Sequence, residues 1–140
     1  MIKPVIRRAD PEDEKVGMFI ARGFAEYSQK SDVVLDYEEF CFTAENEEGE
    51  IIGVVTGKAY YDEVHVDDLI IDENYRRKGI GRELIRTIED AYRDKGYSFI
   101  TLSTFGFQAP DFYKKLGYQI EFIRENKDPR LNKIFMKKEY

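Results

Sequence analysis

A glycine-rich segment at residues 76–82 holds residue types that bind phosphate groups. Gly79 and Gly81 stand where an apolar run at residues 69–71 gives way to an amphipathic segment that ends near Gly96. Glycines at a strand-to-helix junction let the backbone approach a ligand closely and turn unpaired N–H groups toward it. The helix dipole favours an anion at the same place. We therefore expect an anion site, to which four cations add charge: Arg76, Arg77, Lys78 and Arg82.

The spacing of the glycines separates three kinds of phosphate loop. A P-loop needs Gly, four residues and then Gly-Lys-Ser/Thr, whereas a dinucleotide-binding fingerprint needs a third glycine. Neither pattern is present, because Arg82, Glu83 and Leu84 follow Gly81. The pattern that remains is Arg/Gln-x-x-Gly-x-Gly/Ala.

That pattern resembles the pyrophosphate loop of the GCN5-related N-acetyltransferase (GNAT) family, matched here by Arg76, Gly79 and Gly81. A second segment, residues 109–118, reads Ala-Pro-Asp-Phe-Tyr-Lys-Lys-Leu-Gly-Tyr. It looks like the family segment Ala-x-x-Leu/Phe-Tyr-x-x-Leu-Gly-Phe/Tyr. Two motifs at the expected separation are much more specific than either one alone.

Length and composition predict one globular domain over residues 1–140. The chain is 42% hydrophobic and 14% aromatic, enough to fill a single core. Its net charge of −6 argues against nucleic acid and anionic membranes as partners, so the basic cluster is a local feature. The lone cysteine, Cys41, excludes an intramolecular disulfide, and we expect it to be a small core residue. Without a signal peptide or long apolar run, we expect a cytoplasmic protein.

The apolar periodicity predicts the elements that position these residues. We expect an edge strand at residues 2–7, then a helix capped by Asp10 whose apolar stripe from Val16 to Tyr27 packs into a core. Residues 28–39 are predicted to be a loop with a short helical piece. Further strands are predicted at 40–45, 51–61, 64–71, 98–105, 118–123 and 133–138, with helices at 82–95 and 110–116.

This order of elements resembles the GNAT family over essentially the whole chain. The resemblance implies a single-domain α/β fold with a mixed central sheet of six to seven strands. It also implies a parallel strand–helix–strand core over residues 64–105. The fourth strand (residues 64–71) and the fifth strand (residues 98–105) are then expected to splay apart.

The chemistry of acetyl transfer needs two proton handlers. An amine that attacks the thioester of acetyl-CoA must lose a proton, and the departing thiolate benefits from gaining one. Tyr113 is the candidate acid, because a well-positioned phenol of pKa about 10 can donate to a thiolate whose conjugate acid has a pKa near 8.5. The family tyrosine at the matching position has that role. Without the resemblance, packing beside Phe112 and Leu116 explains Tyr113 equally well.

The general base has several candidates. Many family members carry a glutamate on the fourth strand, about eleven residues before the glycine motif, and that position is His65 here. A histidine of pKa near 6.5 can accept a proton directly or through water. Asp67 and Asp68 have the same capacity. Strand alternation puts His65 and Asp67 on one face and Asp68 on the other, unless a bulge intervenes.

The resemblance also implies how acetyl-CoA, the cosubstrate, is held, and it implies no metal. The pantetheine arm lies between the fourth and fifth strands, and the diphosphate meets backbone N–H groups of residues 77–82. Where the family often carries an asparagine, this chain has Gly106, so Thr104 or Gln108 is expected to contact the pantetheine. The predicted cofactor-binding residues are Leu69, Ile70, Ile71, Arg76, Arg77, Lys78, Gly79, Ile80, Gly81, Arg82, Thr104, Gln108 and Tyr113.

The sequence thus predicts an N-acetyltransferase that moves an acetyl group to a primary amine of a small molecule or peptide by direct attack, with a homodimer as an open option. Acidic residues at 32, 36, 38, 39, 62, 63, 67 and 68 suggest a cationic small-molecule acceptor, although an ordinary acidic surface explains them equally well. One alternative is an acyl-CoA-binding or sensing protein without turnover. Another is nucleic-acid binding through residues 76–82, which the net charge opposes.

Overall fold

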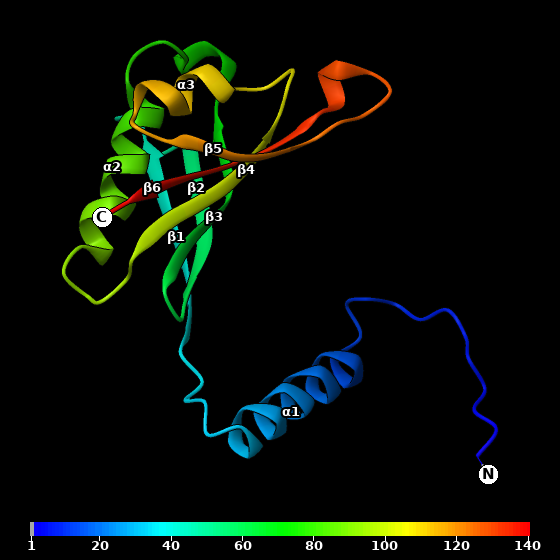
Figure 1. Ribbon diagram of the computed structural model, residues 1–140. Coiled ribbons are helices and arrows are strands. Elements are labelled where there is room, and N and C mark those ends of the chain that lie inside the picture. Colours follow the sequence, from blue (N-terminus) through cyan, green and yellow to red (C-terminus); the bar gives the residue numbers. More distant parts are fainter. Residues whose placement is uncertain (1) are drawn as a thin grey trace. The chain divides into compact units, whose positions relative to one another are not determined.

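The computed structural model describes residues 2–140, which divide into two compact units (Figure 1). The first unit comprises residues 2–35 and the second Asp36–Tyr140. We describe each unit by itself. In the part of the chain that the structure describes, no helix is long and apolar enough to cross a membrane.

The first unit contains one helix, α1 (Glu14–Lys30). Its N-cap is Asp13, whose side chain accepts the N–H of Lys15. The predicted cap at Asp10 is therefore wrong, because Asp10 lies in the preceding turn and accepts the N–H of Glu12. No α1 side chain is buried, contrary to the predicted core stripe, since a lone helix has no second element in its unit to pack against.

The predicted strand at residues 2–7 is also wrong, because these residues form no strand. A strand exists only through hydrogen bonds to a neighbouring strand, and the first unit offers none. The periodicity of Ile2, Val5 and Ile6 suggested a strand without indicating any pairing partner. At the other end of the unit, α1 continues to Lys30 and a loop leads to the second unit, which agrees in outline with the prediction for residues 28–39.

The second unit is built on a mixed six-stranded sheet with the order β1-β2-β3-β4-β6-β5. The strands β3 and β4 run parallel, and the other neighbours run antiparallel. This confirms the predicted mixed α/β sheet, with six strands because residues 2–7 add none. The strands are β1 (Tyr37–Glu45), β2 (Ile51–Tyr60), β3 (Glu63–Ile71), β4 (Phe99–Phe105), β5 (Gln119–Arg124) and β6 (Lys133–Glu139).

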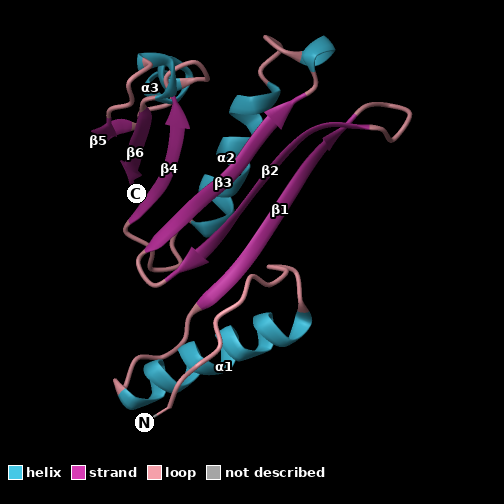
Figure 2. Ribbon diagram, turned by 90° about the vertical axis from the view of Figure 1, so that its right-hand side faces the viewer, coloured by secondary structure: helices cyan, strands magenta, loops and turns pink. Residues whose placement is uncertain are grey.

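The helix α2 (Ile80–Tyr92) connects β3 to β4 and covers one face of the sheet (Figure 2). Its apolar residues recur at three- and four-residue steps, so Leu84, Ile85 and Ile88 all face the core. They pack against inward-facing residues of the sheet such as Val55 and Val64, both fully buried. The shorter elements are α3 (Pro110–Lys115) and the 3₁₀ turns η1 (Glu73–Tyr75) and η2 (Pro129–Leu131).

Strand alternation corrects one predicted core residue. Phe40 of β1 is buried, whereas its neighbour Cys41 is exposed on the opposite face of the strand. The small apolar side chain of a cysteine predicted burial, but the register of β1 with β2 assigns the buried position to Phe40. Cys41 is therefore not a core residue.

A β-bulge interrupts β3 at Asp67. Thr56 of β2 pairs with Asp68 while its neighbour Gly57 pairs with Val66, so Asp67 is the extra residue. Gly57 is required opposite the bulge, because a Cβ there would overlap the carbonyl oxygen of His65 and the ring of Phe40. The bulge reverses the alternation: Val66 faces the core before it, and Leu69 does so after it.

Replacing Gly57 by alanine tests this close approach. We expect Gly57→Ala to lower the free energy of unfolding by about 2 kcal/mol, because the added methyl group must displace the β3 backbone or the Phe40 ring. Urea denaturation followed by tyrosine fluorescence measures the change. Gly17→Ala is the matched control, since a Cβ at Gly17 meets nothing within 4 Å. Equal stabilities of the two variants would contradict the packing described.

Candidate functional site

The parallel strands β3 and β4 pair over three residue pairs, from Glu63↔Phe99 to His65↔Thr101, and then separate. Figure 2 shows β4 leaning away from β3 beyond this point. A cleft of about 1040 Å³ opens between them, lined by both strands, the loop after β3, the start of α2 and α3. This confirms the predicted splay. The volume is at the upper end of the range for small-molecule sites.

The start of α2 presents backbone donors to this cleft. Gly79 is the N-cap in a left-handed conformation (φ 82°), and no side chain caps the helix. The first intrahelical bond runs from the N–H of Glu83 to the carbonyl of Gly79, so the N–H groups of the preceding three residues lack helical partners. Gly81 lies against the ring of Phe112, where a Cβ would stand 3.3 Å from the ring. Free backbone N–H groups at a helix start are the kind of donor that an anion can bind.

The structure separates the four cations of this loop. Arg76, Arg77 and Arg82 line the cleft. The Nε of Arg76 also donates to the carbonyl of Ile71, which fixes the loop to the end of β3. Lys78 does not line the cleft, because its Nζ lies over the ring of Tyr75, 5.5 Å from the centroid.

Tyr113 reaches the cleft from α3 on the core side of the sheet. It is 8% exposed, and burial raises its pKa to about 12. The phenol is therefore protonated at neutral pH, and it is a weaker acid than an exposed tyrosine. Its ring is held by edge-to-face contacts with Phe112, at 5.1 Å between centroids, and with Tyr118, at 5.9 Å.

The loop after β4 explains why this chain has Gly106. A Cβ there would stand 2.8 Å from the carbonyl oxygen of Pro129, so the close approach of η2 excludes a larger residue. Gln108 lines the cleft, and its Oε1 accepts the N–H of Phe105 at 3.0 Å. Thr104 is buried, and its hydroxyl accepts the N–H of Ala109.

The three candidate bases lie on one face of β3, because the bulge at Asp67 returns Asp68 to the face of His65. Asp67 and Asp68 both line the cleft. Asp68 accepts a hydrogen bond from Thr56 at 3.0 Å, and Asp67 forms an ion pair with Lys58 at 3.3 Å. The sequence placed Asp68 on the opposite face from His65 unless a bulge intervened, and the structure contains that bulge.

His65 does not line the cleft, unlike these two carboxylates. Its Nδ1 is 2.7 Å from the hydroxyl of Thr101, which donates in turn to Glu63. Its Nε2 is 3.7 Å from the carboxylate of Asp67. Burial lowers the pKa of His65 below its usual 6.5, and the charge of Asp67 opposes that effect only in part. The imidazole is therefore mainly neutral at pH 7.

Several cleft residues lie outside the sequence motifs. Thr56 and Val54 reach it from β2 through the register of that strand, and Phe107 reaches it from the loop after β4. A smaller recess of about 390 Å³ adjoins the cleft at Thr56 and Asp67 and extends over β1 to Glu39. Over residues 2–140, no cluster of three or more His, Cys, Asp or Glu side chains could hold a metal ion.

Comparison with known proteins gives consistent results. The acetyltransferase (GNAT) family model matches residues 6–118. The chain is 34% identical over 84 residues to blasticidin-S acetyltransferase from Streptomyces morookaense, covering 59% of this chain and 62% of that protein. The chain spans less than two thirds of the curated relatives that it matches.

Solved structures share the fold. An acetyltransferase from Bacillus cereus ATCC 14579 is 33% identical and superposes with a TM-score of 0.78, covering 96% of this chain and 98% of that one. An aminoglycoside 6′-N-acetyltransferase complexed with coenzyme A superposes with a TM-score of 0.62 at 20% identity, covering 73% of each chain.

The half-buried position of His65 predicts a pH dependence of stability. Its pKa lies below 6.5 when folded and near 6.5 when unfolded, so the unfolded chain binds more protons at low pH. The contribution of His65 to stability is therefore lost as pH falls through about 6.5. We expect the urea midpoint of the wild type to decrease between pH 7 and pH 5. The midpoint of the His65→Gln variant should decrease less over the same range. Identical slopes for both proteins would contradict the burial of His65.

Proposed function

Because the chain belongs to the acetyltransferase (GNAT) family, we propose that it transfers an acetyl group from acetyl-CoA to a primary amine. One observation carries the proposal. The same cleft is lined by the glycine loop, by the separated strands, and by Tyr113 and Asp68. A donor with a diphosphate, an extended arm and a thioester requires an anion site, an unpaired strand edge and proton handlers in one continuous space.

The anion site would hold the diphosphate of the donor. The free N–H groups of Ile80, Gly81 and Arg82 face the place where the helix dipole attracts an anion. The guanidinium groups of Arg77 and Arg82 line the same wall and add full charges. Lys78 contributes only a long-range field, because its amine lies over Tyr75.

The unpaired edge of β3 would bind the pantetheine arm. Pairing with β4 ends at His65, so the edge of residues 66–71 that faces the cleft has no strand partner. Its N–H and C=O groups can bond the amides of an extended arm as a strand would. Gln108 supports the same arm from the β4 side. Its Oε1 is occupied by the N–H of Phe105, which leaves its amide nitrogen as a donor for a ligand carbonyl.

The two sides of the splayed strands would then divide the proton transfers. Asp68 accepts a proton from the attacking amine, directly or through water, and the free amine forms a bond to the thioester carbonyl carbon. The tetrahedral intermediate collapses by breaking its carbon–sulfur bond. Tyr113 donates its phenolic proton to the departing sulfur. The nitrogen still carries one proton more than the amide product, and that proton passes through water to solvent while the phenolate takes a proton back.

His65 would support the base without touching the acceptor. Its neutral imidazole faces Asp67, which shares the cleft wall with Asp68, so it can take up a proton passed along the carboxylates. Among residues 2–140, no cation lies within ion-pair distance of Asp68, whereas Asp67 is paired with Lys58. We therefore assign the direct role to Asp68.

The recess over β1 would receive the acceptor. It joins the cleft at Asp67 and Thr56, and Glu39 and Tyr37 extend it away from the thioester. Lys58 also lines the recess and pairs with Asp67, so among the described residues Glu39 is the carboxylate of the recess without a lysine partner and favours a cationic group on the acceptor. The chain is similar to a protein named for the acetylation of blasticidin S, so that compound belongs among the acceptors to test. We therefore propose polyamines and aminoglycoside-like amines as the first acceptors to test, with peptides that carry a free amine beside them.

Replacement of Tyr113 tests the proposed acid. We expect Tyr113→Phe to lower kcat about 100-fold, because the thiolate must leave without a proton donor. Acetyl-CoA affinity, measured by calorimetry, should stay within twofold of the wild type. Tyr97→Phe, which removes a phenol that does not line the cleft, should keep full turnover in a CoA-release assay. A wild type that binds acetyl-CoA but releases no CoA with any amine would instead support a sensing protein.

Replacement of Arg82 tests the anion site. We expect Arg82→Ala to raise the KM for acetyl-CoA about tenfold and to leave kcat unchanged, since a charge-assisted bond to phosphate would be lost in ground and transition states alike. Arg86→Ala is the matched control, because Arg86 lies one turn further along α2 and outside the cleft lining. An equal rise in KM for the two variants would indicate a general charge effect and count against a site at the helix start.

A further inference from the structure

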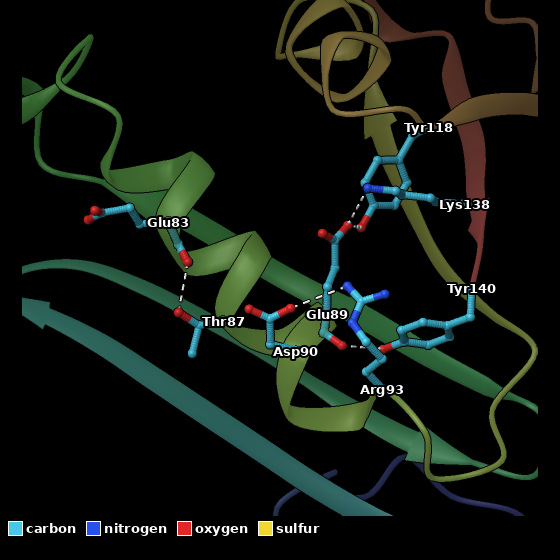
Figure 3. A network of polar contacts seen from close by, with 8 residues as sticks. All are labelled: Glu83, Thr87, Glu89, Asp90, Arg93, Tyr118, Lys138 and Tyr140. Carbon is cyan, nitrogen blue, oxygen red and sulfur yellow. Dashed lines mark hydrogen bonds and ion pairs between the residues drawn. The ribbon is translucent and has the colours of Figure 1, made fainter.

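A buried carboxylate that takes no part in the proposed reaction lies on α2. Glu89 is 5% exposed, and its Oε2 accepts the hydroxyl of Tyr118 at 3.0 Å and the amine of Lys138 at 3.1 Å (Figure 3). The hydroxyl of Tyr140 donates to the backbone carbonyl of the same residue at 2.9 Å. A buried charge is unfavourable without partners, so the bonds from Tyr118 and Lys138 offset the cost of burying the Glu89 carboxylate.

Tyr118 connects this network to Tyr113. Its ring meets the ring of Tyr113 edge-to-face, at 5.9 Å between centroids and 71° between planes. Its backbone N–H donates to the carbonyl of Tyr113 at 3.0 Å, across the left-handed turn at Gly117. The Nζ of Lys138 lies over the Tyr118 ring, 5.7 Å from the centroid. Tyr118 is thus held by Glu89 at its hydroxyl and packs against the candidate acid.

We propose that Glu89 is a positioning residue for Tyr113: by fixing the hydroxyl of Tyr118, it fixes the ring against which Tyr113 packs and so the direction of the Tyr113 phenol in the cleft. This inference rests on the proposed role of Tyr113 in acetyl transfer. A hydrogen bond is directional, so it sets the tilt of the Tyr118 ring more narrowly than apolar packing does.

Two further observations fit this role. Burial and the Glu89 carboxylate raise the pKa of Tyr118 well above its ordinary value, so Tyr118 stays protonated and keeps donating to Glu89. Glu89 also lies eight residues after Gly81 on the same helix, about 12 Å along the axis. The helix whose start would hold the diphosphate therefore also positions Tyr113. This keeps the distance between the diphosphate site and the Tyr113 phenol constant.

The test compares variants that differ in this one hydrogen bond. We expect Tyr118→Phe to lower kcat about tenfold, because even a small displacement of the Tyr113 phenol from its reacting position slows the reaction. The KM for acetyl-CoA should stay within twofold, since the glycine loop and the β3 edge are untouched. Glu89→Gln keeps an oxygen that accepts the Tyr118 hydroxyl, so its kcat should fall less than threefold, whereas Glu89→Leu should match Tyr118→Phe.

Tyr140→Phe is the matched control, because it removes a hydrogen bond to Glu89 that does not involve Tyr118. We expect it to lower the thermal midpoint as much as Tyr118→Phe does while leaving kcat within twofold. In the Tyr113→Phe background, Tyr118→Phe should lower kcat by less than a further twofold, since its effect passes through Tyr113. A further tenfold loss of kcat when Tyr118→Phe is added to Tyr113→Phe would overturn the proposal. A tenfold loss of kcat in Tyr140→Phe, or an unchanged kcat in Tyr118→Phe, would overturn it as well.

A second measurement does not depend on turnover. In protein labelled with ¹³Cε-tyrosine, the Tyr113 signal is the one that Tyr113→Phe removes. We expect this signal to shift in Tyr118→Phe and Glu89→Leu and to stay in place in Tyr140→Phe. If the wild type acetylates no amine, the proposed function fails and this signal alone decides the positioning role. An unshifted Tyr113 signal in Tyr118→Phe would then refute it.

Discussion

The separation of β3 from β4 is the constraint on which the rest of the second unit depends. Each strand keeps a full partner on its other side, β2 for β3 and β6 for β4, so the sheet survives the loss of pairing in the middle. The separation leaves one edge of β3, at residues 66–71, without a neighbouring strand to bond. Backbone groups in that position need water or a ligand. A parted parallel pair therefore offers unpaired backbone groups to a ligand.

The helix α2 explains how a parted sheet remains stable. Its apolar face packs on β1, β2 and β3, whose buried residues include Phe40, Val55 and Val64. Its free N-terminus faces the cleft, and its buried Glu89 binds Tyr118 near the end of α3. One helix thus supports the sheet, presents free N–H groups to the cleft and contacts the segment that carries Tyr113.

The local motifs of the site were predictable from the sequence, because they depend on few neighbouring residues. Gly79 and Gly81 mark a strand-to-helix turn by spacing alone, and the structure places both in the cleft wall with Tyr113. The face of Asp68 was not predictable, since the bulge that sets it depends on Gly57 in another strand. The position of Lys78 outside the cleft was not predictable either, because its amine lies over the ring of Tyr75.

Longer-range features were harder to predict for a related reason. The strand expected at residues 2–7 and the core position expected for Cys41 both rested on residue type, whereas pairing and register decide them. The Asp10 cap was placed one turn early because Asp10 and Asp13 are equally good capping residues. Glu89 carried no signal at all, since a glutamate on a helix is ordinarily exposed and only the partners Tyr118 and Lys138 make it a buried residue.

Hydrogen–deuterium exchange with and without coenzyme A tests the central claim, that the parted strands and the start of α2 bind the donor. Amide exchange reports bonding of the backbone groups in question. We predict that saturating coenzyme A slows exchange at least tenfold in residues 66–71 and 77–82 and leaves residues 37–43 of β1 unchanged. Protection confined to β1, or binding without protection of either predicted segment, would contradict the account.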